Sequence, residues 1–129
     1  DFSKVNATPD DFSSACEWFN VYGLPGLMLD HAEIVASALG FIRQQLNYHP
    51  IGYNLLPEKF TMPDLQKLYE TILGRSLDRR NFQRKMLSVG ILKRLPEKKV
   101  GLTHKAPYYY KFDMRKYQKT LQSGMGFQL

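Results

Sequence analysis

The sequence has a single cysteine and no long apolar run, and both scarcities limit what the chain can be. Cys16 has no second cysteine to pair with, so an internal disulfide is excluded and a small core residue is expected there. No stretch of about 18 apolar residues is present, and the first residues lack the basic and apolar regions of a signal peptide. We therefore expect a soluble, cytoplasmic protein without membrane contact.

Histidine is scarce as well. The three histidines are His31, His49 and His104, and no two of them have the spacing of metal ligands. His31 and His49 are interpreted as capping or surface residues. We identify no catalytic residue and expect neither a metal site nor a bound cofactor.

Positive charge is scarce in the first part of the chain and concentrated in the second. Residues 1–49 carry two basic against six acidic side chains, a net charge of −4, whereas residues 50–129 carry sixteen basic against six acidic, a net charge of +10. A polyanion should therefore bind within the second part.

The first half of the chain holds one helical pattern between two short apolar segments. Residues 17–22 could form a short strand before the breaks at Gly23 and Pro25. Asp30 is a candidate N-cap for a helix over residues 31–47. Residues 51–56 are suited to a single strand before Pro57.

The signals that mark the start of the next helix, at Thr61, are more specific than those of the preceding segments. Thr61 and Asp64 have the spacing of a capping box, with Pro63 in the first turn. Apolar residues then recur with the period of a helix until Gly74, which is expected to end it.

A second N-cap, Asp78, follows a short turn and begins a helix that is expected to run to about Val89. Residues 91–95 and 107–112 are expected to form two strands, joined by a basic connection over residues 96–106. A last short helix is expected over residues 115–121, and residues 122–129 are expected to be frayed.

This order of elements is that of a winged helix-turn-helix. The fold class is therefore α+β and mainly helical, with a small β-hairpin as the wing and residues 31–121 as the DNA-binding domain. In such a fold the second helix of the pair enters the major groove, here residues 78–89.

That helix has two faces on a helical wheel. Phe82, Met86 and Val89 fall within about 60° of arc, and Arg80 and Arg84 lie opposite. Arginine can bond bidentately to guanine, and asparagine or glutamine to adenine. The sequence therefore predicts base-edge contacts from the outward face, whose other members are Asn81, Gln83 and Ser88.

The remaining candidate contacts are with phosphates. Arg79 and Lys85 lie nearer the buried edge of the helix, and Thr61 with the first amides of its helix could hold a phosphate. The hairpin tip contributes Lys98, Lys99, His104 and Lys105. Tyr108, Tyr109 and Tyr110 alternate across a strand and are assigned mainly to packing.

Three segments resemble the Nudix-related transcriptional regulators of bacteria: residues 50–61, 64–74 and 77–85. The resemblance implies a winged helix that follows a Nudix-like effector domain, with residues 1–30 as the tail of that domain. It also implies a regulator of sugar or nicotinamide-cofactor metabolism, a sugar or ADP-ribose-like effector, and a homodimer on a palindromic double-stranded DNA operator.

Two features depart from the family pattern. The chain contains no Nudix box, the carboxylate motif that holds the catalytic metal, so hydrolysis is not expected and the chain is expected to be part of a longer regulator. Lys105-Ala106 stands where the wing often has Arg-Gly. Two alternatives stay open: a winged helix that contacts an acidic protein, and a Nudix-type hydrolase.

Overall fold

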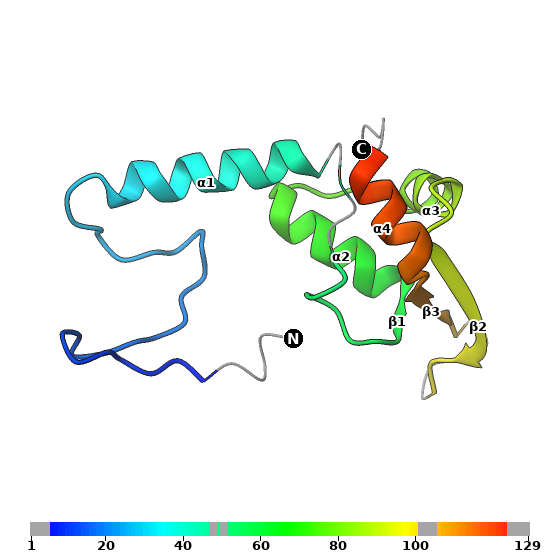
Figure 1. Ribbon diagram of the computed structural model, residues 1–129, viewed down its shortest axis with the longest axis horizontal. Coiled ribbons are helices and arrows are strands. Elements are labelled where there is room, and N and C mark those ends of the chain that lie inside the picture. The colour runs from blue at the N-terminus through cyan, green and yellow to red at the C-terminus, as the bar shows by residue number, and fades with distance from the viewer. Residues whose placement is uncertain (1–5, 47–48, 50–51, 101–105, 124–129) are drawn as a thin grey trace.

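Four helices and a small antiparallel sheet make up the described part of the chain (Figure 1). The computed structural model describes residues 6–46, residue 49, residues 52–100 and residues 106–123. The elements follow in the order α1 (His31–Gln45), β1 (Phe60–Thr61), α2 (Met62–Leu73), α3 (Arg79–Ser88), β2 (Leu92–Lys98), β3 (Tyr108–Phe112) and α4 (Met114–Ser123). The predicted α+β winged-helix order is confirmed.

The sheet has the strand order β1-β3-β2, with both pairs antiparallel. Its first strand was not expected: Phe60 pairs with Tyr110, so the residues that lead into α2 join the sheet. The strand predicted over residues 51–56 is wrong for its described part, since the amides of Leu55 and Leu56 turn back to the carbonyl of Gly52. Gly52 has φ +139°, a backbone conformation that residues with a Cβ rarely adopt, so glycine is favoured at this turn.

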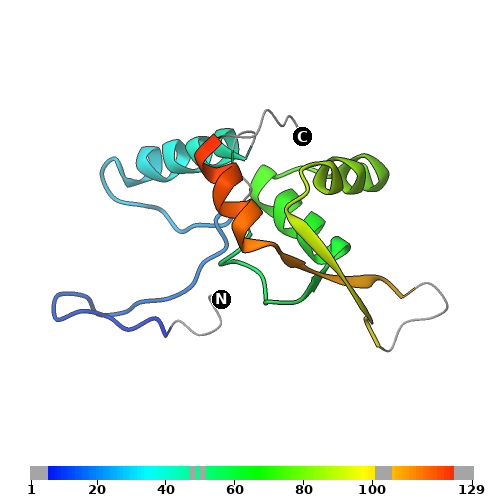
Figure 2. The ribbon, with the colours of Figure 1, turned by 45° about the vertical axis from the view of Figure 1, so that its right-hand side comes forward.

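The hairpin β2–β3 projects beyond the helices (Figure 2). β2 continues through Pro96 to Lys98, although we expected it to end at Leu95. The ladder is interrupted between Arg94 and Lys98, where the register shifts. Proline can occupy such an irregularity because no amide is required of it there.

Both helices of the helix-turn-helix begin at the predicted caps. Thr61 and Asp64 form the full capping box of α2, and Gly74 ends that helix with a left-handed φ of 69°. Asp78 accepts a hydrogen bond of 2.8 Å from the amide of Asn81 at the start of α3. The boundaries were predictable because each depends on residues within one turn.

The core lies between α2, α3, the sheet and α4. Tyr69 and Phe82 meet edge to face at 5.4 Å between ring centroids and join α2 to α3. Phe112 packs against Phe60 at 4.9 Å and against Tyr117 at 5.3 Å, which joins the sheet to α4. α4 extends to Ser123, so the expected fraying does not begin at residue 122, and residues 124–129 lie outside the described residues.

The N-terminal part of the chain adds little to this core. No residue of α1 is buried, and its N-terminal end lies well away from the sheet (Figure 1). Asp30 makes no side-chain capping bond, the strand predicted over residues 17–22 is not formed, and Cys16 is exposed rather than in the core. The predicted cap, the predicted strand and the buried position of Cys16 are therefore wrong.

Polar contacts fasten this part to the end of α2. The Tyr22 hydroxyl donates to the carbonyl of Thr71 at 2.7 Å, and Arg43 Nε donates to that of Ile72 at 3.0 Å. A cation is favourable there because the last carbonyls of a helix carry partial negative charge.

Two features are absent from the described residues. None of their helices has the length and apolarity needed to cross a bilayer. Within the same residues, no three His, Cys, Asp or Glu side chains gather as a metal site would require.

The core contact of α3 gives a stability prediction. Phe82 is 2% exposed, so Phe82→Ala should lower the free energy of unfolding by about 3–5 kcal/mol, because it removes apolar burial and leaves a cavity. Leu87→Ala on the same helix is the control, since Leu87 is 42% exposed and should change that free energy by less than about 1 kcal/mol. Equal losses in urea denaturation would contradict the assignment of the two faces.

Candidate nucleic-acid interface

α3 separates its apolar and basic side chains onto opposite sides. Phe82 and Met86 are buried, whereas Arg80 and Arg84 are exposed. The predicted direction of the two arginines is therefore observed. Of the other candidates on this helix, the exposed ones are Arg79, Asn81 and Ser88, and the half-buried ones are Gln83 and Lys85.

The turn before α3 is held by two side chains of α2. Gln66 Nε2 donates to the carbonyl of Leu77 at 2.9 Å, and the amide of Leu77 donates to Glu70 Oε1, also at 2.9 Å. This second bond is the largest of the causes that lower the pKa of Glu70. Because both backbone groups of Leu77 are engaged, the angle at which α3 leaves the turn is fixed. Sequence analysis missed this tie, although Gln66 and Glu70 stand one helical turn apart.

A hydrogen-bond chain orders the start of the exposed face. Arg84 Nη2 donates to Asn81 Oδ1 at 2.7 Å, while the Asn81 amide is held by Asp78. The guanidinium and the carboxamide therefore lie side by side on one surface. These are the two side-chain groups that suit guanine and adenine edges.

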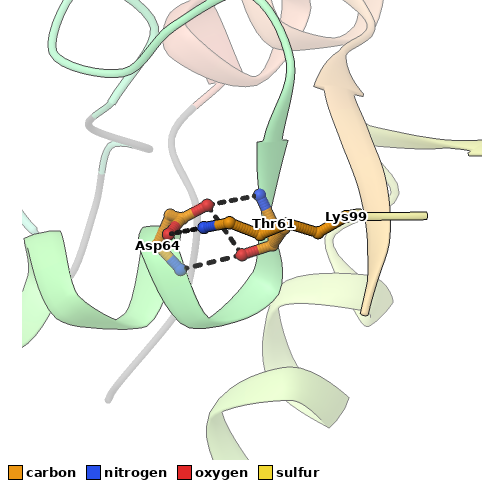
Figure 3. A network of polar contacts seen from close by, with 3 residues as sticks. All are labelled: Thr61, Asp64 and Lys99. Atoms are coloured by element: carbon orange, nitrogen blue, oxygen red, sulfur yellow. Dashed lines mark hydrogen bonds and ion pairs between the residues drawn. The ribbon is translucent and has the colours of Figure 1, made fainter. Parts of the chain in front are cut away.

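The N-terminus of α2 differs from what we expected. Thr61 is 1% exposed, and its hydroxyl donates to Asp64 Oδ2 at 2.7 Å and accepts from the Asp64 amide at 3.3 Å (Figure 3). Pro63 has no amide to offer. Thr61 is therefore withdrawn as a direct phosphate contact, because its side chain is buried and its hydroxyl is already used.

Lys99 reaches from the hairpin to the same cap. Its Nζ lies 3.6 Å from Asp64 Oδ1 (Figure 3), so part of its charge is neutralised within the fold. Burial raises the pKa of the Asp64 carboxyl, but hydrogen bonds from Thr61 and the charge of Lys99 lower it more, and the pKa lies below its usual value of 3.8. The cap thus links α2 to the wing.

Two other hairpin cations lie against an aromatic ring. The guanidinium carbon of Arg94 is 4.8 Å from the ring centroid of Tyr108, and Lys98 Nζ is 4.7 Å from it. Sequence analysis named Lys98 but missed Arg94, because the register shift that brings both to Tyr108 cannot be derived from the sequence. The other two wing candidates, His104 and Lys105, lie outside the described residues.

A cavity of about 130 Å³ lies where α2, α3 and β3 meet. Its walls include Pro63 of α2, Arg79 and Gln83 of α3, and Tyr108 of β3. α3 and β3 therefore border one cavity, and Arg79 places a positive charge in its wall.

Known proteins resemble this chain in the same region. Residues 52–112 match the family described as "NrtR DNA-binding winged helix domain". A curated relative from Acinetobacter baylyi, the "ADPR responsive transcriptional repressor NtrR", is 29% identical over 83 residues, which are 64% of this chain and 33% of that protein. The chain thus spans about a third of the relative's length.

Two solved structures share the fold. NrtR of Shewanella oneidensis in complex with a 27mer DNA superimposes with a TM-score of 0.61 at 23% identity, over 77% of this chain and 44% of that one. The structure of the same protein described without DNA gives a TM-score of 0.58 at 24% identity, over 71% and 41% of the two chains. The winged-helix fold is therefore shown.

The capping box gives a prediction about pH. Because the pKa of Asp64 is lowered in the folded chain, its ionised form stabilises the fold above the usual carboxyl pKa, and this contribution is lost as the pH falls through the lowered value. Asp64→Ala should cost about 1 kcal/mol of unfolding free energy at pH 7 and clearly less near pH 2.5.

The control is Glu58→Ala, which removes an exposed carboxylate from the preceding loop and should have little effect at either pH. Denaturant titrations of the three chains at both pH values provide the measurement. A cost for Asp64→Ala that does not change with pH would show that the charge of Asp64 is irrelevant to the cap.

Proposed function

We propose that this chain is the DNA-binding part of a transcriptional regulator and that α3 reads base edges in the major groove of an operator. The observation that carries the proposal is the outward direction of Arg80 and Arg84 on a helix whose other side is fixed in the core. The fold supports it, since the second helix of a helix-turn-helix is the one that enters the groove. So does the solved relative with a 27mer DNA.

Each predicted contact except Thr61 has a role in this proposal. Arg80, Asn81, Gln83, Arg84 and Ser88 face base edges, while Arg79 and Lys85 reach phosphates. Lys98 and Lys99 of the hairpin add sequence-independent contacts that weaken as salt rises. His104 and Lys105, which lie outside the described residues, keep the same proposed role.

The proposal extends to a longer regulator. Residues 1–30 would be the tail of a Nudix-like effector domain, residues 31–121 the DNA-binding domain, and the whole protein a homodimer on a palindromic operator. A repressor whose printed name says it responds to ADPR supports an ADP-ribose-like effector and a role in sugar or NAD-related metabolism.

The two alternatives receive less support. A protein-binding helix would need an exposed apolar anchor, and Leu87 is the one large hydrophobic side chain that α3 exposes, beside several cations. The Nudix-hydrolase alternative has less support because this sequence does not contain the metal-binding motif of such enzymes, and the curated relative is described as a repressor.

The base-reading role of Arg84 can be tested with duplex DNA. The chain is first used to select a preferred duplex from a random library, and binding is then measured to that duplex and to a scrambled one. Arg84→Ala should weaken binding to the selected duplex by roughly 5- to 100-fold, corresponding to one lost bidentate base contact, and to the scrambled duplex by much less.

Lys119→Ala is the charge-matched control, because it removes one positive charge from α4, outside the proposed interface. It should change binding to both duplexes by less than about twofold. Equal losses on the two duplexes for Arg84→Ala would argue against base reading, and failure of the unsubstituted chain to bind any duplex would refute the proposed function.

A further inference from the structure

Tyr108 occupies an unusual position at the base of the wing. It lies on the same face of β3 as Tyr110 and Phe112, which are buried, because alternate residues of a strand share a face. Tyr108 itself is 36% exposed and lines the cavity beside Arg79 and Gln83. Its ring therefore continues the core face of the hairpin out toward the recognition helix.

The two cations on this ring differ from the other paired charges of the hairpin. Lys99 has Asp64 as its partner, and Glu97 pairs with Lys59 at 2.9 Å. In the described part of the chain, neither Arg94 nor Lys98 forms an ion pair with a carboxylate. Their charges are held by the negative face of an aromatic ring, which attracts a cation without neutralising it.

We propose that Tyr108 is a positioning residue, whose ring holds Arg94 and Lys98 in place for one stretch of the DNA phosphate backbone between the wing and α3. This inference rests on the proposed function and adds Arg94 to the DNA contacts.

The physical reason is the cost of ordering long side chains. Arginine and lysine each lose considerable rotamer freedom when a phosphate immobilises them. A ring that restrains both before binding removes part of that cost. It also offsets the repulsion between two cations that lie within 5 Å of the same centroid.

Phosphate is the ligand class that this arrangement suits. Two cations on one ring, beside the cavity that Tyr108 lines, match the closely spaced charges of one DNA strand. The site contributes no sequence preference, since phosphates carry no base information. Its loss should therefore weaken binding to all duplexes alike, unlike the loss of Arg84.

The test compares Tyr108→Leu, which removes the aromatic ring, with Tyr108→Phe, which keeps it. Tyr109→Leu is the matched control, because Tyr109 neighbours Tyr108 but lies on the opposite face of the same strand. Each chain is measured for binding to selected and scrambled duplexes between 50 and 200 mM salt. Proton NMR of the free chain measures ring-current shifts at the methylene groups of Arg94 and Lys98.

We expect Tyr108→Leu to weaken binding to both duplexes by about three- to tenfold and to abolish the ring-current shifts. Tyr108→Phe and Tyr109→Leu should stay within about twofold of the unsubstituted chain. In an Arg94→Ala, Lys98→Ala background, Tyr108→Leu should cause no further loss, because the tyrosine acts through those two side chains.

Other outcomes would overturn the inference in distinguishable ways. Normal binding by Tyr108→Leu, or a loss that persists in the doubly substituted background, would show that Tyr108 does not act through the two cations. A loss in Tyr108→Phe equal to that in Tyr108→Leu would assign the effect to the hydroxyl. Ring-current shifts in a chain that binds no duplex would refute the proposed function and, with it, the phosphate contact.

Discussion

The burial of Phe82 and Met86 against α2 is the interaction on which the rest of the structure depends. These two side chains fix the rotation of α3 about its own axis, since only one side of the helix can face the core. Arg80 and Arg84 then have no direction open to them but solvent. The bonds from Gln66 and Glu70 to Leu77 fix the angle of the helix, so both its rotation and its direction are determined from α2.

The wing is placed by the same helix. Asp64 caps α2 and pairs with Lys99, while β1, which leads into α2, supplies the edge on which β3 pairs. α3 and the hairpin therefore share one support, and residues of both line a single cavity. The charges of the hairpin cations are neutralised unevenly. Lys99 forms an ion pair with a carboxylate, whereas Arg94 and Lys98 lie against an aromatic ring.

Features determined by nearby residues could be predicted from the sequence, and features determined by distant ones could not. The caps at Thr61 and Asp78 and the two faces of α3 depend on spacings of three or four residues, and the structure has them as expected. β1, the continuation of β2 through Pro96 and the convergence of Arg94 on Tyr108 depend on strand register, which one sequence does not reveal. The burial of Thr61 followed from β1, so the phosphate contact assigned to it was wrong for a non-local reason. The helical pattern of α1 was correct, although its apolar side chains remain unburied in the described chain.

The central claim is that duplex DNA meets the exposed side of α3, and amide chemical shifts of the ¹⁵N-labelled chain during titration with a selected duplex test it most directly. The account predicts that the largest changes fall on Arg80, Asn81 and Arg84, followed by the hairpin, with α1 and α4 little affected. Changes concentrated on α1 or α4, with those of α3 unmoved at saturating duplex, would contradict it.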